Sequence, residues 1–502
     1  MQKFKRVLVV LTTAFLIVIL LELLSKILII TALKNKINPD ILRTEFEEIY
    51  VPPFEDKKPD DFWIFVYGGS TVQGLPLPKI GFTNQLQYQL NKVFESGNIK
   101  VFNLGWAGFN STRIRYLLER TIDQKPDLII VYTGENEFIY PQLDFYWLVK
   151  AVPAVKNRSS LGRLMMYVIK SIGTQDSQEL FTSDKKFPAY GSNGLLVFLK
   201  QKIFETNMKM ITDVTRKRQV PLLFGIPAHN ISDWPPVRKE VTTARTTQDY
   251  QEAFQKAYTF IDNDKFQEAK NIIDHSLIDY PNDAPLLFLK ATIEREKGSE
   301  SKVLFSEAKD KDLVPWRTTT THSDFIKSLA NGEDVWVVDF AQVLSESSKD
   351  GLVGFYLILD GTHPTKEGAY LITKSLVEFI KQEKLINEKW LNASDDVYPM
   401  GELFTKMNIT LQDDFFVFLK TAQLSLKSPL LNIKASKFYI EKAEKIDNQN
   451  WETKAVKASS AHLAGDDQSA LSYLQEAERL KGSSLTSQET GHIPYLWEIL
   501  SN

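Results

Sequence analysis

Residues Phe62 to Thr71 read FWIFVYGGST, and this stretch decides the kind of fold that the chain can adopt. A continuous apolar run that stops at two glycines is typical of a strand covered on both faces. Similar runs follow at Val101 to Leu104, Leu128 to Tyr132, Leu222 to Ile226 and Val335 to Phe340. Segments with helical spacing, Phe82 to Phe94 and Ser111 to Ile122, lie between the first three runs. This alternation predicts an α/β fold of three layers, with a parallel sheet between helices.

Three of the expected strands are followed by residues with a use in catalysis. Ser70 comes after the first strand, Gly108 after the second and Asn136 after the third. Because the carboxyl ends of parallel strands meet at one edge of a sheet, we expect these residues at one rim. Ser70 is a candidate nucleophile, and the N–H groups of Ser70 and Gly108 with the Asn136 amide are a candidate oxyanion hole. Taken singly, each is more often a cap or turn residue.

A later segment, Asp360-Gly361-Thr362-His363-Pro364, supplies a candidate base and its orienting carboxylate. At a spacing of three on one loop, the Asp360 carboxylate can accept from the His363 imidazole and fix its tautomer. The ordinary alternative is an Asp-Gly turn followed by a surface histidine. Together with Ser70, the pair predicts a Ser-His-Asp triad for acyl transfer, although more than two hundred residues separate Asn136 from Asp360.

Composition excludes several other classes of function. A chain of 502 residues is expected to form two or three domains, and its net charge of −3 argues against a nucleic-acid partner. The absence of cysteine excludes disulfides, thiolate catalysis and cysteine-based metal sites. Six histidines, at positions 229, 275, 322, 363, 462 and 492, include no pair at ligand spacing. We therefore expect neither a metal nor another cofactor.

The N-terminal segment predicts a membrane anchor. Basic residues at positions 3, 5 and 6 precede an apolar run from Val7 to Leu24, about the length that crosses a bilayer as a helix. No small-residue cleavage site follows Leu24, which favours an uncleaved anchor over a signal peptide. Basic residues flank both sides of the run, but we expect the bulk of the chain outside the cytoplasm, in the periplasm.

Two regions predict helical repeats. Residues Tyr250 to Pro281 have the spacing of paired helices, with apolar packing positions of a tetratricopeptide repeat. Near the other end, EKAEKI from Glu441 and QEAERL from Gln475 stand 34 residues apart, the period of that repeat. Such units must bury their faces on the rest of the chain or on a protein partner. Plain helical hairpins without a binding role are the alternative.

In their order and spacing, the four segments around Ser70, Gly108, Asn136 and His363 resemble the blocks of the SGNH (GDSL-like) hydrolase family. The chain also resembles the subgroup of that family that has tetratricopeptide-like repeats beside a GGST-type first block. The resemblance implies a flavodoxin-like hydrolase fold with a Ser70-His363-Asp360 triad and an oxyanion hole of Ser70, Gly108 and Asn136. Two positions depart from the family pattern, since Gly69 and Glu137 stand where aspartates are usual.

The resemblance also implies further site residues and an activity. His229 and Asn230, in the segment Ile226 to Asn230, and Arg317 would line the substrate side; Asn110 and Glu135 are further candidate substrate-binding residues. The implied activity is hydrolysis of O-acyl esters of envelope glycans or lipids. An O-acyltransferase would need the same residues, and a membrane-tethered repeat scaffold with an idle hydrolase-like domain is the third hypothesis.

The expected organisation has six parts. They are a tail and transmembrane anchor (1–33), a connector (34–60), a discontinuous hydrolase-like domain (61–385), a helical connector (386–432), a tetratricopeptide-like repeat (433–485) and a tail (486–502). Within the hydrolase-like domain we expect a cap over the cleft at 141–215 and inserted tetratricopeptide-like helices at 248–312.

Overall fold

The computed structural model describes residues 2–31, 49–94, 98–138, 159–164, 194–236, 248–295, 299–386, 397–427, 431–486, 489, 493, 495 and 496. The chain divides into two units. One comprises Met1–Phe54 with Pro141–Asp176, and the other comprises Glu55–Tyr140 with Ser177–Asn502.

The smaller unit contains α1 (Gln2–Thr31), the helix that the N-terminal apolar run predicts. Within this unit the Glu22 carboxylate accepts hydrogen bonds from the Ser159 hydroxyl at 2.6 Å, from the Leu161 N–H at 2.9 Å and from the Ser160 N–H. In the part of the chain that the structure describes, no helix has the length and hydropathy that a membrane span requires.

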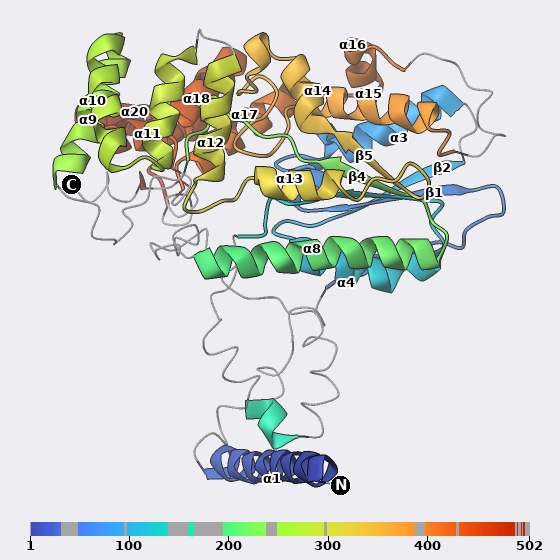
Figure 1. Ribbon diagram of the computed structural model, residues 1–502. Coiled ribbons are helices and arrows are strands. Elements are labelled where there is room, and N and C mark those ends of the chain that lie inside the picture. The colour runs from blue at the N-terminus through green and yellow to red at the C-terminus, as the bar shows by residue number, and fades with distance from the viewer. Residues whose placement is uncertain are drawn as a thin grey trace. The chain divides into compact units, whose positions relative to one another are not determined.

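The larger unit is built on a sheet of five parallel strands, as the apolar runs predict (Figure 1). The strands are β1 (Phe62–Gly68), β2 (Ile99–Gly105), β3 (Leu128–Tyr132), β4 (Leu222–Ile226) and β5 (Val335–Asp339), in the order β2-β1-β3-β4-β5. Gly68 is in register with Gly105 of β2 and with Tyr132 of β3. The segments after these three strands therefore leave the sheet at one edge, at the point where the strand order reverses.

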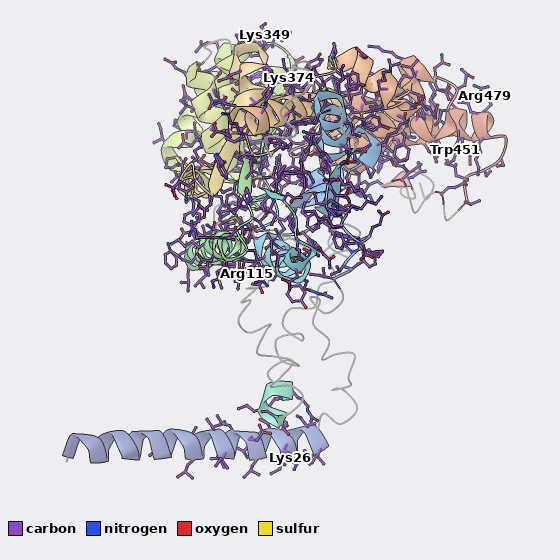
Figure 2. The ribbon with its side chains drawn as sticks, turned by 90° about the vertical axis from the view of Figure 1, so that its right-hand side faces the viewer. Lys26, Arg115, Lys349, Lys374, Trp451 and Arg479 are labelled. Atoms are coloured by element: carbon purple, nitrogen blue, oxygen red, sulfur yellow. The ribbon has the colours of Figure 1, made fainter. Side chains whose placement is uncertain are left out.

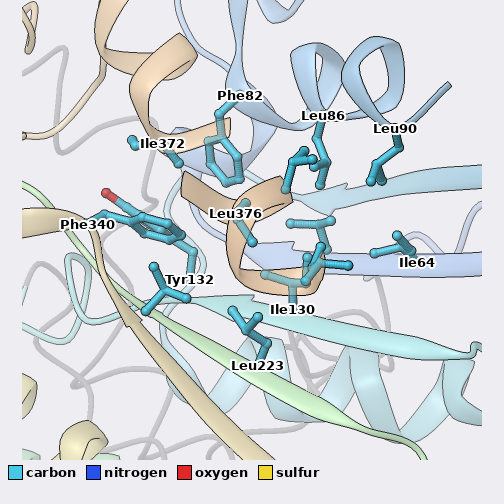
Figure 3. Packing of buried hydrophobic residues seen from close by; sticks show 14 of the residues in the cluster. Ile64, Phe82, Leu86, Leu90, Ile130, Tyr132, Leu223, Phe340, Ile372 and Leu376 are labelled. Carbon is cyan, nitrogen blue, oxygen red and sulfur yellow. The ribbon is translucent and has the colours of Figure 1, made fainter. Parts of the chain in front are cut away.

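Helices cover both faces of the sheet (Figure 1). On one face lie α3 (Phe82–Phe94), α14 (Phe340–Glu346) and α15 (Lys366–Gln382). Their apolar side chains pack against alternate strand residues such as Ile64, Ile130 and Leu223 (Figure 3). On the other face lie α4 (Ser111–Thr121), α8 (Gly194–Lys217) and α13 (Thr320–Lys327). Burial on both faces explains why β1 has no charged side chain.

The last part of the expected cap, residues 194–215, forms a helix on a face of the sheet. Residues 194–215 belong to α8, which packs along α4 on a face of the sheet (Figure 1). Its buried side chains, Phe204, Met208 and Ile211, are those of a sheet-covering helix. Of the remaining stretch, 141–158 and 165–193 lie outside the described residues.

The region expected to hold inserted repeats is helical. It contains α9 (Gln248–Asp262), α10 (Phe266–Asp279), α11 (Ala284–Ile293) and α12 (Ser299–Asp310). Helix α9 packs on α10 and α11 on α12, with Phe254, Ile273 and Leu286 in a small apolar core. Their classification as tetratricopeptide-like stays a prediction.

The C-terminal region is also helical, with α16 (Met400–Lys406), α17 (Leu411–Ser425), α18 (Ile433–Ile446), α19 (Trp451–Leu463) and α20 (Asp467–Lys481). Figure 2 labels Trp451 at the start of α19 and Arg479 near the end of α20. One apolar cluster joins these helices to the sheet-bearing part of the unit, because it contains Trp234 and Leu359 together with Phe415 and Tyr439. The helices thus bury their inner faces on the same unit that carries the candidate site.

Candidate active site

Ser70 lies at a sharp turn between β1 and the short helix α2 (Ser70–Gln73). At Gly68, a β-carbon would approach the Tyr132 carbonyl oxygen to 2.4 Å, so the turn requires a glycine there. Gly74 ends α2 with a φ of 89°, in the left-handed region that favours glycine. The glycines on either side of Ser70 therefore hold its hydroxyl at the strand edge.

The structure brings Ser70, His363 and Asp360 into one hydrogen-bonded chain. The Ser70 Oγ lies 2.8 Å from His363 Nε2, and His363 Nδ1 lies 2.7 Å from Asp360 Oδ2. The second oxygen of Asp360 accepts from the backbone N–H groups of Thr362 at 2.8 Å and His363 at 2.9 Å. This arrangement presents the Nδ1–H to the carboxylate and leaves Nε2 free to accept a proton from Ser70.

The electrostatics of the pair favour an anionic Asp360 beside the imidazole. Burial raises the pKa of Asp360, but the charge of His363 and the hydrogen bonds to the carboxylate outweigh it and leave the pKa below its ordinary value. Burial lowers the pKa of His363, but the charge of Asp360 and their hydrogen bond raise it above its ordinary value. The carboxylate thus makes the imidazole a stronger base, which general-base catalysis requires.

Gly108 lies on the loop after β2, and α2 holds this loop in place. Gly108 has a φ of 75°, and the neighbouring Ala107 N–H donates to Gln73 Oε1 at 2.9 Å. Among the described residues, neither the Ser70 N–H nor the Gly108 N–H has a hydrogen-bond acceptor. Both donors are therefore available to a substrate oxygen.

Asn136 is buried next to Gly69, and its amide Nδ2 donates to the Phe109 carbonyl at 2.9 Å. That bond uses one of the two amide hydrogens and orients the other. A β-carbon at Gly69 would come within 2.6 Å of this nitrogen. The glycine that stands in place of the family's aspartate therefore allows the amide to lie against the turn that carries Ser70.

Glu137, the second departure, supports the start of α4. Its carboxylate accepts from the Ser111 N–H at 2.7 Å and from the Ser111 hydroxyl at 2.8 Å. A carboxylate at a helix N-terminus is favourable because it meets free N–H groups and the positive end of the helix dipole. Glu137 thus holds α4 against the strand end after β3.

Glu135 is buried beside the triad. Its Oε2 accepts from the Thr71 hydroxyl at 2.8 Å, and its Oε1 has no hydrogen-bond partner among the described residues. Burial raises the pKa of Glu135 to about 8 against the opposing effects of His363 and Thr71. At neutral pH this carboxyl is mainly protonated, so Asp360 is the charged partner of His363.

The other candidate substrate-binding residues make their contacts inside the protein. Asn110 caps α4 by accepting from the Arg113 N–H, and His229 Nε2 accepts from the Thr318 N–H at 3.0 Å. Asn230 donates to the Ile358 carbonyl at 3.3 Å, and Arg317 donates to the carbonyls of Asn230 at 3.1 Å and Trp234 at 2.8 Å.

These contacts correct the expectation that His229, Asn230 and Arg317 line the substrate side. All three are buried, and the two Nη atoms of Arg317 are engaged with carbonyls and with Asp312. The backbone N–H of Asn230 donates to the Gly361 carbonyl at 3.2 Å. Asn230 therefore ties the loop after β4 to the loop that carries Asp360 and His363, whereas His229 and Arg317 tie it to the segment 312–318.

Two residues that sequence reasoning missed also support this loop. The Trp316 indole packs on Gly361, where a β-carbon would lie 2.4 Å from the ring. The Tyr439 hydroxyl, on α18, donates to the Leu359 carbonyl at 2.6 Å. A motif search would not find either residue, because only the tertiary fold brings them to the loop.

A cavity of about 350 Å³ opens beside Asp360 and His363. This volume is in the lower part of the range for small-molecule sites. Its apolar walls comprise Leu75, Pro76, Trp234, Leu359, Phe416 and Leu424. The last two belong to α17, so the C-terminal helices supply one side of the cavity. Among the described residues, no cluster of three acidic or histidine side chains could hold a metal ion.

Comparisons with known proteins give only distant likenesses. No protein-family profile and no curated protein matches the sequence. Among solved structures, a GDSL-like lipase from Bacteroides thetaiotaomicron is 10% identical with a TM-score of 0.26, covering 67% of this chain and 94% of that one. A proposed acylhydrolase from Bacteroides fragilis is 11% identical with a TM-score of 0.25, covering 70% of this chain and 99% of that one. Because both TM-scores are below 0.5, the function of this chain is argued from the geometry of the site.

Proposed function

We propose that this chain is a serine esterase that hydrolyses O-acyl esters. The observation that carries the proposal is the hydrogen-bonded chain from Ser70 Oγ through His363 to Asp360, with distances of 2.8 and 2.7 Å. A serine within reach of an imidazole whose other nitrogen faces a carboxylate is the arrangement that activates a hydroxyl for acyl transfer.

In the first half of the reaction, Ser70 Oγ attacks the ester carbonyl while its proton passes to His363 Nε2. The carbonyl oxygen becomes an oxyanion, which the N–H groups of Ser70 and Gly108 and the Asn136 amide stabilise. One such donor is worth about 3 kcal/mol in the transition state. Asp360 stabilises the imidazolium without taking its proton.

The tetrahedral intermediate collapses when the carbon–oxygen bond to the alcohol breaks. His363 gives its proton to the leaving alcohol oxygen, and the acyl group stays on Ser70. Water then attacks the acyl-enzyme, with His363 as base, and releases the carboxylic acid and the free serine.

Ser70→Ala tests the proposal. The substitution removes the nucleophilic hydroxyl. We therefore expect turnover of 4-nitrophenyl acetate to fall by at least about 10³-fold, while the thermal unfolding temperature is unchanged. A fluorophosphonate probe should label the wild-type chain and fail to label the variant. Wild-type turnover in the alanine variant would remove Ser70 from the mechanism.

A further inference from the structure

The cavity beside the triad lies next to His363 and Asp360 rather than next to the oxyanion donors. Its described lining includes Asp360 and His363 but none of the three oxyanion donors, Ser70, Gly108 and Asn136. In serine ester hydrolysis the oxyanion donors hold the carbonyl oxygen, and the imidazole gives its proton to the alcohol oxygen. A group in this cavity is therefore adjacent to the proton donor, where the alcohol portion of the ester must lie.

The C-terminal helices form the far wall of the cavity, and ion pairs fix their position. Lys79 pairs with Asp413 at 2.8 Å, and Lys366 pairs with Asp414 at 2.6 Å. Both aspartates are in the first turn of α17, and both lysines belong to the sheet-bearing part of the unit. Together with the bond from Tyr439 to the Leu359 carbonyl, these contacts join the wall to the catalytic loop.

Two lysines of this wall differ from the paired ones. Lys420 and Lys427 line the cavity, and among the described residues neither has a carboxylate within 4.0 Å. Lys420 Nζ donates to Gln423 Oε1 at 3.0 Å and lies 5.9 Å from the centre of the Phe416 ring. The cavity has one carboxylate in its lining, Asp360, and both oxygens of Asp360 already accept hydrogen bonds inside the triad loop.

We propose that this cavity binds the alcohol portion of the ester and that this portion carries a carboxylate or phosphate group, which Lys420 and Lys427 hold. The inference rests on the proposed esterase function. Two lysines without carboxylate partners among the described residues, in the lining of a mainly apolar cavity, favour an anion whose remaining surface is apolar. Such a ligand has its carboxylate or phosphate group next to Lys420 and Lys427 and its ester oxygen next to His363.

The experiment compares matched acetate esters on the full-length chain. The neutral substrate is 4-acetoxy-3-nitrobenzamide, and the charged ones are 4-acetoxy-3-nitrobenzoate and 4-acetoxy-3-nitrophenyl phosphate. Each kcat/KM is divided by the rate constant of uncatalysed hydrolysis, which corrects for leaving-group reactivity. We expect the wild type to prefer at least one charged ester over the amide, and the preferred one identifies the anion.

Substitutions then assign the preference to the cavity. Lys420→Gln and Lys427→Gln should each lower the ratio of charged to neutral turnover by about threefold. Lys420→Arg keeps the charge and should keep the preference. Lys434→Gln is the matched control, since Lys434 is exposed on α18 and does not line the cavity.

The outcomes separate this inference from the proposed function. If the wild type turns over all three esters without preference, or if the double Lys420→Gln, Lys427→Gln variant keeps the preference, the inference is wrong and the esterase proposal stands. If the wild type hydrolyses none of the esters and is not labelled by a fluorophosphonate, the esterase proposal falls and this inference with it.

Discussion

At the scale of single residues, the small size of Gly69 determines the geometry of the candidate oxyanion hole. Gly69 has no side chain, and the Asn136 amide occupies the volume that a β-carbon would fill. The amide can therefore reach both the Phe109 carbonyl and the turn that carries Ser70. The missing side chain of Gly69 therefore determines where the Asn136 amide can donate a hydrogen bond.

Gly69→Ala should consequently impair catalysis more than folding. The new methyl group would lie 2.6 Å from Asn136 Nδ2 and push the amide away from the oxyanion. Loss of one such donor lowers kcat by about 10²- to 10³-fold. Gly401→Ala is the matched control, since a β-carbon there meets nothing within 4 Å. Steady-state kinetics with 4-nitrophenyl acetate would contradict the prediction if both variants had the wild-type kcat.

The raised pKa of Glu135 predicts how the stability of the folded protein depends on pH. Burial raises its pKa from 4.5 to about 8, so between these values the folded state holds a proton that the unfolded state releases. The contribution of this group to stability is therefore lost as pH rises from about 4.5 through 8.

Glu135→Gln replaces the protonated carboxyl with a neutral amide of similar shape. The variant therefore does not lose stability at this position as pH rises. We expect the variant to gain stability relative to the wild type between pH 6 and pH 9, by on the order of 2 kcal/mol. Chemical denaturation at both pH values measures the change. Glu402→Gln, at an exposed site, serves as control. An identical pH dependence in wild type and Glu135→Gln would show that Glu135 is charged in the folded protein.

At the scale of elements, the loop between α14 and α15, which carries Asp360 and His363, depends on its neighbours for its shape. It receives hydrogen bonds from Asn230 on the loop after β4 and from Tyr439 on α18, and Trp316 packs on Gly361. Three supports of this kind hold His363 at the position from which its Nε2 reaches Ser70 Oγ.

Tyr439→Phe tests the support from α18. The variant leaves the Leu359 carbonyl, which is next to Asp360, without its 2.6 Å donor. We expect a loss of about 1 kcal/mol in stability and a several-fold lower kcat with little change in KM. Tyr473→Phe, on α20, is the control for loss of a tyrosine hydroxyl. A kcat equal to that of the wild type would show that α18 does not position the loop.

At the scale of the whole molecule, one apolar core links the candidate site to helices far along the chain. Leu474 on α20 is 3% exposed and belongs to the same cluster as Trp234 and Leu359, which line the cavity. Because protein interiors are close-packed, a gap in this cluster affects every element that borders it. The C-terminal helices are therefore part of the folded unit that carries the site.

Leu474→Ala should lower the temperature at which the proposed esterase activity is lost, although Leu474 lies on α20 and takes no part in the proposed reaction. The cavity it creates costs about 2–5 kcal/mol. Leu471→Ala, on the same helix and 50% exposed, should leave that temperature nearly unchanged. Thermal inactivation and the loss of far-UV circular dichroism are measured in parallel, and an inactivation temperature of Leu474→Ala equal to that of the wild type would contradict the prediction.

The local pattern of residues was sufficient for the sheet and for the edge at which the candidate site lies. Buried strands need apolar side chains on both faces, so the five runs beginning with Phe62 to Tyr67 predict the parallel α/β sheet. The chain positions of Ser70, Gly108 and Asn136 after successive strands predict a common rim. The membrane anchor and the tetratricopeptide-like classification stay predictions from the same patterns.

Contacts between distant segments decided the rest. The sequence alone does not reveal that Arg317 and Asn230 are buried supports, that α8 covers a sheet face, or that α17 closes one side of the cavity. Each of these depends on which surfaces meet after folding, and residues that are far apart in the sequence leave no local periodicity that records their contact. The 2.8 Å separation of Ser70 Oγ and His363 Nε2 is of the same kind, since the two residues are 293 positions apart in the sequence and only the packed core brings them together.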